Sequence, residues 1–299
     1  MTTAPERTAD AYPTRVSTGF SEIERADPVV WGSATDGPMD QQTLDSFDAK
    51  GYLSVEQLVT PEEVETFRAE LRRLSDDPKV REDERTVVER QSQEVRSIFE
   101  VHKISDVFAK IANDPRVVGR ARQILGSDVY IHQSRVNFKP GYDGKEFYWH
   151  SDFETWHAED GMPRMRAVSI SIALTDNYSY NGPLMIMPGS HKTYISCAGE
   201  TPDDNYKSSL VAQEAGTPDQ DSLARLNERH GIDVLEGKAG GATMFDCNCM
   251  HGSNGNITPL PRSNVFMVFN SVENTCVEPF AAKNPRPSFI GARDFTPVG

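Results

Sequence analysis

The sequence contains few cysteines and lacks any long apolar run. Its four cysteines, Cys197, Cys247, Cys249 and Cys276, follow no disulfide spacing. We therefore expect free thiols in a reducing compartment, which is the cytoplasm. No segment approaches the roughly 18 apolar residues that cross a bilayer. The first twenty residues lack the apolar stretch of a secretory signal, so we expect neither export nor a membrane partner.

Basic residues are also scarce relative to acidic ones. Lys and Arg total 31 against 45 Asp and Glu, which gives a net charge of −14. Proteins that bind nucleic acid concentrate positive charge, so this balance argues against a nucleic-acid partner. Apolar residues make up 37% and charged residues 25%, which is typical of a globular protein, and the length suits one large domain or two small ones.

The N-terminal half predicts helices. Residues 1–40 are rich in Thr, Ala, Asp and Pro, and we expect a loosely ordered N-terminal arm able to dock on the body. Helices are predicted over 41–50, after the capping box of Thr60 and Glu63, and from Asp114 to a stop at Gly126. A strand is expected between the first two helices, around 51–59.

After Gly126 the pattern changes to strands separated by turns. The predicted strands are 129–139, 167–175, 183–187, 241–246 and 265–270. Helices followed by a run of strands indicate a β core with helices packed outside. The polar segment from about 196 to 230 reads as an insertion between strands, and insertions of this length often cover active sites.

One predicted strand carries polar residues on a single face. Because side chains alternate along a strand, Gln133, Arg135, Asn137 and Lys139 share a side of the segment 129–139. The commoner interpretation of such a strand is a face exposed to solvent. The other is a polar face that lines a ligand cavity inside a barrel.

A metal-binding pattern follows directly. His150 and Asp152 are two residues apart, so an extended segment points both to one side. His251 lies 99 residues after Asp152 and completes a set of two histidines and one carboxylate, which leaves open positions on a divalent transition metal. A zinc site of Cys247, Cys249 and His251 is the competing set, but it lacks a fourth ligand nearby.

Two cations add to this pattern. Arg262 lies eleven residues after His251, and a guanidinium there can pair with a carboxylate through two hydrogen bonds. Lys139, at the end of the polar face, offers a second positive charge. A 2-oxoglutarate site would need such a group for the carboxylate far from the metal.

Long segments of the sequence resemble one family. The segment FYWHSDFETWHAEDGMPRMRA (147–167) resembles the signature of ectoine hydroxylases, within the phytanoyl-CoA dioxygenase-like family of Fe(II)- and 2-oxoglutarate-dependent oxygenases. The resemblance runs from about residue 41 to 295 and includes QSRVNFKPG, NGPLMIMPGSHK and MFDCNCMHGSNGN. It implies a mainly β fold, a double-stranded β-helix (jelly-roll, cupin-like) core flanked by α-helices, in a single domain over 41–299.

The resemblance also implies roles for individual residues and a homodimer. The expected Fe(II) ligands are His150, Asp152 and His251. The residues expected to bind 2-oxoglutarate are Lys139, Arg262, Asn137, Phe147 and Ser169. Those expected to bind ectoine are Gln133, Trp156, Thr155 and Arg135. No side chain beyond the iron ligands is expected to be catalytic, and O₂ is the second co-substrate.

The implied reaction converts ectoine to 5-hydroxyectoine with release of succinate and CO₂. The chemistry of ectoine agrees with the residues. Its delocalised amidinium suits the face of Trp156, and Gln133 can hydrogen-bond either its N–H groups or its carboxylate. The alternatives are a related oxygenase that hydroxylates a free amino acid such as proline, and a non-catalytic jelly-roll binding protein. A zinc hydrolase would need a base and an oxyanion hole near the ligands, and we find neither.

Overall fold

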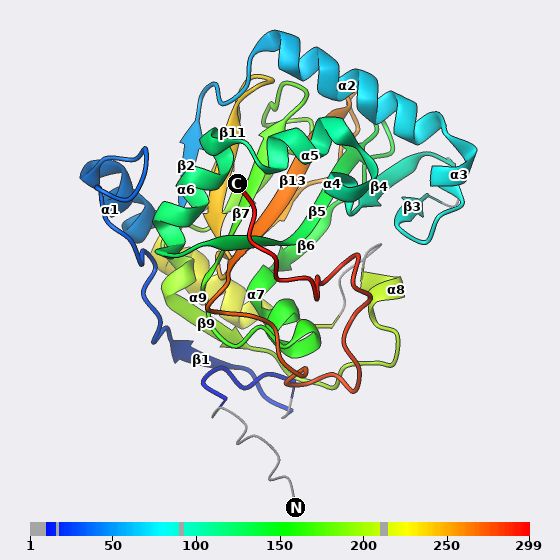
Figure 1. Ribbon diagram of the computed structural model, residues 1–299. Helices are drawn as coiled ribbons and strands as arrows, with labels where there is room; N and C mark the ends of the chain where they lie inside the picture. The colour runs from blue at the N-terminus through cyan, green and yellow to red at the C-terminus, as the bar shows by residue number, and fades with distance from the viewer. Residues whose placement is uncertain (1–9, 16–17, 90–92, 210–214) are drawn as a thin grey trace, which may run out of the picture.

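A computed structural model of the chain describes residues 10–15, 18–89, 93–209 and 215–299. Antiparallel sheets form its centre, and helices lie outside them (Figure 1). This arrangement confirms the predicted jelly-roll core flanked by helices. Among the described helices, none has both the length and the apolar composition that a membrane crossing requires.

The largest sheet of the described residues has seven antiparallel strands. Their order is β2 (Tyr52–Val55), β11 (Ala242–Asp246), β7 (Ala167–Ala173), β13 (Arg262–Ser271), β5 (Val129–Lys139), β4 (Val95–Phe99) and β3 (Thr86–Val88). The long strands β5 and β13 pair along their whole length at its centre. Both ends of this order are free edges, so the sheet is not a closed barrel.

Two smaller sheets complete the β structure of the described residues. One has the order β10 (Asp233–Leu235), β8 (Leu184–Ile186), β12 (His251–Ser253) and β6 (Phe147–His150). The other pairs β1 (Ser21–Glu24) with β9 (Thr193–Ser196). The short sheet containing β6 and β12 matters most here, because it contributes both predicted histidine ligands.

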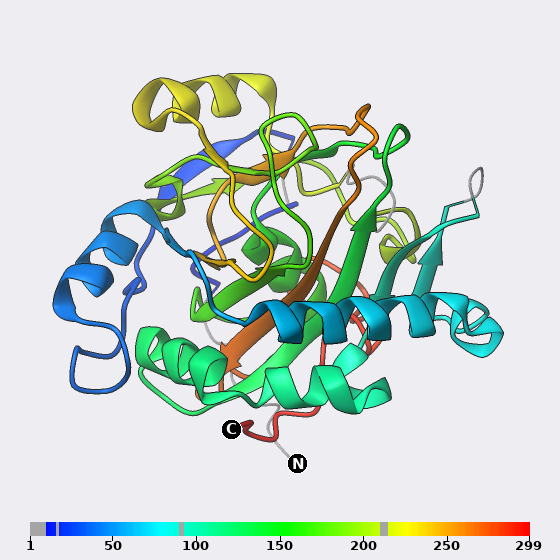
Figure 2. The same cartoon turned by 90° about the horizontal axis from the view of Figure 1, so that it is seen from above.

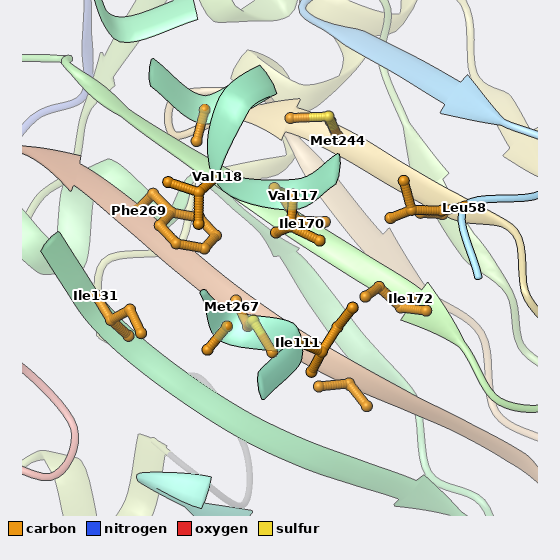
Figure 3. Packing of buried hydrophobic residues seen from close by; sticks show 14 of the residues in the cluster. Leu58, Ile111, Val117, Val118, Ile131, Ile170, Ile172, Met244, Met267 and Phe269 are labelled. Carbon is orange, nitrogen blue, oxygen red and sulfur yellow. The ribbon is translucent and has the colours of Figure 1, made fainter. Parts of the chain in front are cut away.

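Helices pack against one face of the large sheet. The N-terminal helices are α1 (Gln41–Lys50), α2 (Pro61–Asp76), α3 (Pro78–Arg81), α4 (Val101–Ile104), α5 (Asp106–Ala112) and α6 (Pro115–Leu125). Figure 2 shows α2, α5 and α6 lying across β5 and β13. Apolar side chains from these helices and from strands β5, β7, β11 and β13 form the main core between them (Figure 3).

A second group of helices lies at the opposite end of the molecule from α2 (Figure 1). It consists of α7 (Asp152–Thr155), the π-helix η1 (Trp156–Asp160), the 3-10 helix η2 (Ser190–Lys192), α8 (Tyr206–Ser209) and α9 (Gln220–His230). Helices α7 and η1 follow β6 without a break larger than one residue. They therefore extend the chain directly from the predicted ligands His150 and Asp152.

The local signals in the sequence explain where the main helices begin and end. Thr60 and Glu63 form the predicted reciprocal capping box at the start of α2. Asp114 caps α6, which ends where Gly126 adopts a left-handed conformation that glycine accepts without strain. The predicted starts of α2 and α6 are therefore confirmed.

The strands agree with prediction except at some ends. Strand β5 has the predicted bounds, whereas β7 ends two residues early and β2 covers only part of 51–59. Strand β13 begins at Arg262, three residues before the predicted start, because Arg262 pairs with Lys139 across the ladder. This pairing brings the two predicted cations together.

The N-terminal arm packs closely on the body in its described residues, in contrast to the loose order that its composition predicts. Tyr12 is 1% exposed, and its ring packs edge-on against Phe153 and Tyr194 at 5.4 Å each. Strand β1 pairs with β9, which adds backbone hydrogen bonds. These contacts order the arm because they bury aromatic surface and satisfy its backbone. The boundary near residue 40 and the single domain over 41–299 stay predictions.

Candidate metal centre and co-substrate cavity

A cavity of about 380 Å³ lies where the large sheet and the sheet containing β6 and β12 face each other. Many of the predicted site residues line it. They are Arg135, Asn137 and Lys139 from β5, Phe147 and His150 from β6, His251 from β12, and Arg262 from β13. The polar face of β5 therefore lines a cavity, and the solvent-exposed interpretation is wrong.

Three predicted ligands converge at one side of this cavity. His150 and His251 are direct partners across the β6–β12 ladder, with ring centroids 4.2 Å apart. Asp152 begins α7, and its Oδ1 lies 3.5 Å from Nε2 of His150 and 3.9 Å from Nε2 of His251. One ligand atom from each residue lies within 4.8 Å of the other two, so one ion can contact all three.

Backbone carbonyls orient both imidazoles. Nδ1 of His150 donates to the carbonyl of Tyr148 at 2.8 Å, and Nδ1 of His251 donates to that of Cys249 at 2.9 Å. In a neutral ring with this tautomer, Nε2 is the nitrogen free to bind a metal, and in both residues it lies toward Asp152. Hydrogen bonds of this kind are usual for histidines that bind metals, because they fix both the tautomer and the ring.

The protonation states also suit a cation. Burial and the neighbouring His150 lower the pKa of His251 to about 4, so the ring is neutral, which is the form that binds metal. Burial acts to raise the pKa of Asp152, but His251, His150 and Arg135 outweigh it and keep that pKa well below its usual range. Ser169 Oγ donates to Oδ2 of Asp152 at 3.3 Å and fixes the carboxylate. The donor set fits a divalent transition metal.

The two predicted cations form a carboxylate site. Lys139 Nζ donates to Ser253 Oγ at 2.9 Å and to the carbonyl of Asn254 at 2.6 Å, while Arg262 donates to the carbonyl of Gly182. Among the described residues, no carboxylate lies within ion-pair distance of either cation.

Burial removes water from the charges of Lys139 and Arg262, and no ion pair among the described residues replaces it. Burial and the nearby Arg262 lower the pKa of Lys139 to about 7, and burial lowers the pKa of Arg262 to about 10. An incoming carboxylate would restore the balance of charge. The pair is therefore suited to hold an anionic ligand whose other end reaches the three metal ligands.

The predicted ectoine residues are divided between the cavity wall and the interior. Arg135 lines the cavity, with its guanidinium 4.2 Å from the ring centroid of Phe266. Desolvation lowers the pKa of Arg135 to about 10. Gln133 accepts a hydrogen bond from Arg135 and donates from Nε2 to the carbonyl of Ile290 at 2.7 Å. Gln133 is thus coupled to the cavity through Arg135.

Three other predicted residues do not line the cavity. Trp156 is 3% exposed, and its ring packs edge-on against His132 at 5.3 Å. Thr155 is buried beside it in α7. Ser169 reaches the site only through Asp152. Their assigned roles in binding ectoine or 2-oxoglutarate stay predictions.

Two phenylalanines also line the cavity, and the sequence did not predict either as a site residue. Phe245 lies 4.9 Å from the ring of His251, and Phe266 lies under Arg135. Apolar residues in strands are typical of a core, so their residue type alone does not indicate a place in the site. The alternation of side chains would have identified Phe266, since it shares a face of β13 with Arg262.

The competing zinc set is not supported. Burial raises the pKa of the Cys247 and Cys249 thiols well above its usual value, so both stay protonated. Cys249 Sγ donates to the carbonyl of Gly51 at 3.1 Å, away from a shared ligand position. Among the described residues, the convergent group contains His251 with His150 and Asp152 and neither cysteine.

Comparison with known proteins finds similarity to the family that the sequence resembles. The model of the phytanoyl-CoA dioxygenase (PhyH) family matches residues 47–264. The chain is 63% identical over 299 residues to the ectoine dioxygenase of Streptomyces coelicolor, with 100% of both chains covered. It is 50% identical over 289 residues to that of Halomonas elongata, covering 96% of this chain and 87% of the relative.

Solved structures agree in fold over the same length. The chain is similar to EctD from S. alaskensis with 2-oxoglutarate and 5-hydroxyectoine, with a TM-score of 0.87, 46% identity, and coverage of 97% of this chain and 96% of that one. The structure of EctD with bound Fe gives a TM-score of 0.87 at 45% identity, with coverage of 97% and 98%.

Proposed function

Because the chain belongs to the phytanoyl-CoA dioxygenase (PhyH) family, we propose that it is an Fe(II)- and 2-oxoglutarate-dependent dioxygenase that hydroxylates ectoine to 5-hydroxyectoine. One observation supports this most directly. His150 and His251, which converge with Asp152 on one metal position, line the same cavity as two cations that have no ion-pair partner among the described residues. The relatives named ectoine dioxygenase, identical over 50–63% of their aligned residues, support the choice of substrate.

His150, Asp152 and His251 would hold the ferrous ion on one side and leave the other side for ligands. Bound there with 2-oxoglutarate and O₂, iron supplies the oxidation that inserts one oxygen atom into a C–H bond of ectoine, with succinate and CO₂ as the other products. The hydrogen bonds from the histidine Nδ1 atoms keep Nε2 directed at the ion. Ser169 would hold Asp152 in its ligating orientation.

The co-substrate fits between the ligands and the cations. Arg262 and Lys139 would bind the distal carboxylate of 2-oxoglutarate, and the phenyl ring of Phe147 would cover its chain. Asn137, which accepts a hydrogen bond from Ser97 at 2.9 Å, would bound the same space. The protein contributes placement here, because a fixed geometry replaces the search that free reactants would need.

Ectoine carries a positive ring and a carboxylate, so it needs aromatic and cationic partners. Arg135 is placed to pair with the carboxylate from the cavity wall. Gln133 of β5, Thr155 of α7 and Trp156 of η1 are proposed to contact the ring, as the resemblance implies. No side chain has to act as a general base, since the oxidation removes a hydrogen atom rather than a proton.

The test is reconstitution of the protein with Fe(II) under anaerobic conditions, followed by O₂, 2-oxoglutarate and ectoine. We expect a product one oxygen atom heavier than ectoine and an equal amount of succinate. Proline in place of ectoine distinguishes the amino-acid hydroxylase, which would oxidise proline faster. An Asp152→Ala variant is the matched control and should release neither product. Oxidation of proline in preference to ectoine would refute the substrate assignment.

We also infer a homodimer, which the resemblance implies, and a cytoplasmic location, which the cysteine pattern favours. Light scattering of the purified protein tests the first part by mass. A monomer at micromolar concentration would contradict it.

A further inference from the structure

The N-terminal arm places one arginine deep in the interior. The Arg15 side chain is 1% exposed. Its Nε and Nη2 donate to the two carboxylate oxygens of Glu154 at 2.9 and 2.6 Å, and its Nη1 donates to Glu159 Oε1 at 2.6 Å. A forked pair to one carboxylate plus a bond to a second fixes a guanidinium firmly. The backbone of Arg15 is left-handed, with φ of 54°, which residues other than glycine rarely adopt.

The two glutamates belong to the segment that follows the metal ligand Asp152. Glu154 lies two residues after Asp152 in α7, and Glu159 lies three residues after Trp156 in the π-helix η1. Both carboxylates are buried. π-Helical turns are rare and occur often at functional sites. Arg15 therefore joins both halves of the segment 152–160.

Residues of the polar insertion, over about 196–230, contact Arg15 and its ion-pair partners. Thr201 Oγ1 accepts from Arg15 at 3.1 Å, and Asn205 Nδ2 donates to Glu159 Oε1 at 2.7 Å. Gly216 lies so close that a Cβ there would be 2.0 Å from Glu154 Oε2 and 2.4 Å from Arg15 Nη2. The arm, the segment 152–160 and the insertion thus converge on one group.

Among the described residues, no other cation forms an ion pair with Glu154 or Glu159. Arg286 interacts electrostatically with Glu159, but its forked hydrogen-bonded pair is with Asp160, at 2.8 and 2.5 Å. In the described part of the chain, Arg15 is the one ion-pair partner of Glu154 and of Glu159. Loss of Arg15 would remove the ion-pair partner of two buried carboxylates, a costly change that favours displacement of the segment.

We propose that Arg15 is a positioning residue for the hydroxylation, which sets the orientation of the segment 152–160 and thereby the placement of ectoine. This inference rests on the proposed function, since Thr155 and Trp156 in that segment are proposed to contact ectoine. The 2-oxoglutarate cations Lys139 and Arg262 lie on β5 and β13, outside the segment. Ser169 of β7 holds the metal ligand Asp152 from outside the segment, so we expect the displacement over 153–160 and an effect mainly on substrate binding.

The test compares Arg15→Met with Glu22→Gln. Glu22 also links the arm to the insertion, through partly exposed ion pairs with Arg225 and Arg229, so its loss is a matched control. For Arg15→Met we expect the KM for ectoine to rise about tenfold, because displacement of the segment moves the residues proposed to bind ectoine away from their contacts. We also expect succinate to exceed hydroxyectoine, with an unchanged KM for 2-oxoglutarate. Glu22→Gln should match the wild type.

Hydrogen exchange of the metal-free protein gives a second readout that does not depend on activity. Backbone amides of 152–160 should exchange faster in Arg15→Met than in Glu22→Gln. Arg15→Lys covers the case in which Arg15→Met does not fold, because lysine keeps the charge but cannot bridge both glutamates. It should show a smaller change in the same direction.

The outcomes separate the two proposals. If the wild type does not oxidise ectoine, the proposed function fails, while the exchange experiment still tests the link between Arg15 and the segment. If the wild type is active and Arg15→Met lowers only kcat, with KM and the ratio of products unchanged, then Arg15 is merely structural and the inference is wrong. The inference is also wrong if Arg15→Lys shows the same hydrogen exchange over 152–160 and the same KM for ectoine as the wild type.

Discussion

Replacing Lys139 with methionine should remove most of the pH dependence of 2-oxoglutarate binding. Burial and the positive charge of Arg262 lower the pKa of Lys139 to about 7, against 10.5 for an ordinary lysine. A carboxylate bound beside it favours the ammonium form and raises that pKa again. Binding above pH 7 must therefore be accompanied by uptake of a proton.

The direction and size of the effect follow from this linkage. Below pH 7 the amine is already protonated, so this group adds no pH dependence. Above pH 7 the affinity falls as the pH rises, by at most about tenfold per pH unit, which corresponds to about 1.4 kcal/mol. Arg262 stays charged throughout and solvent screens part of the interaction, so we expect a loss of about tenfold between pH 7 and pH 9.

Titration calorimetry with Mn(II) in place of the oxidisable Fe(II) measures this directly. Two buffers with different protonation enthalpies report the protons taken up at pH 8.5, which should be about 0.4 per site for the wild type, the uptake that a tenfold loss between pH 7 and pH 9 implies. Lys139→Arg stays charged and should bind well with no uptake, whereas Lys139→Met should bind weakly with no uptake. If Lys139→Met shows the same pH slope as the wild type, the assignment of this lysine is refuted.

Three further predictions concern the metal centre and the core. His251→Ala should bind less than a tenth of an equivalent of iron by elemental analysis and lose turnover, and full iron occupancy would contradict the ligand assignment. Ser169→Ala should weaken iron binding about tenfold, because Oδ2 of Asp152 loses its hydrogen bond, and a competition titration with a chelator measures this. Phe269→Ala should lower the free energy of unfolding by about 3–5 kcal/mol in a urea titration, since Phe269 is fully buried; a change below 1 kcal/mol would disprove its core role.

Much of the site could be predicted from the sequence because local chemistry determines it. The spacing of His150 and Asp152 on an extended segment restricts both side chains to one side, and the alternation along β5 places Arg135 and Lys139 on one face. The capping residues of α2 likewise act within a few positions. Each of these signals depends on neighbours in the chain, so a single sequence reveals it.

The parts that could not be predicted depend on contacts between distant segments. The register that places His150 opposite His251 joins strands a hundred residues apart, and no local pattern determines it. Arg15 lies in a stretch of disordered composition, and its burial depends on Glu154 and Glu159 far along the chain. The orientation of Trp156 depends on the π-helical turn, which changes the helical period on which sequence patterns rely.

The direct pairing of His150 with His251 has a consequence for folding. A ferrous ion bound by both would link two short strands that lie far apart in the sequence. Binding of iron and closure of the small sheet would then be one coupled equilibrium. Each tenfold excess of free metal over its dissociation constant then adds about 1.4 kcal/mol to the free energy of unfolding. Iron supply would thus determine how much of this protein survives heating, as well as how fast it turns over.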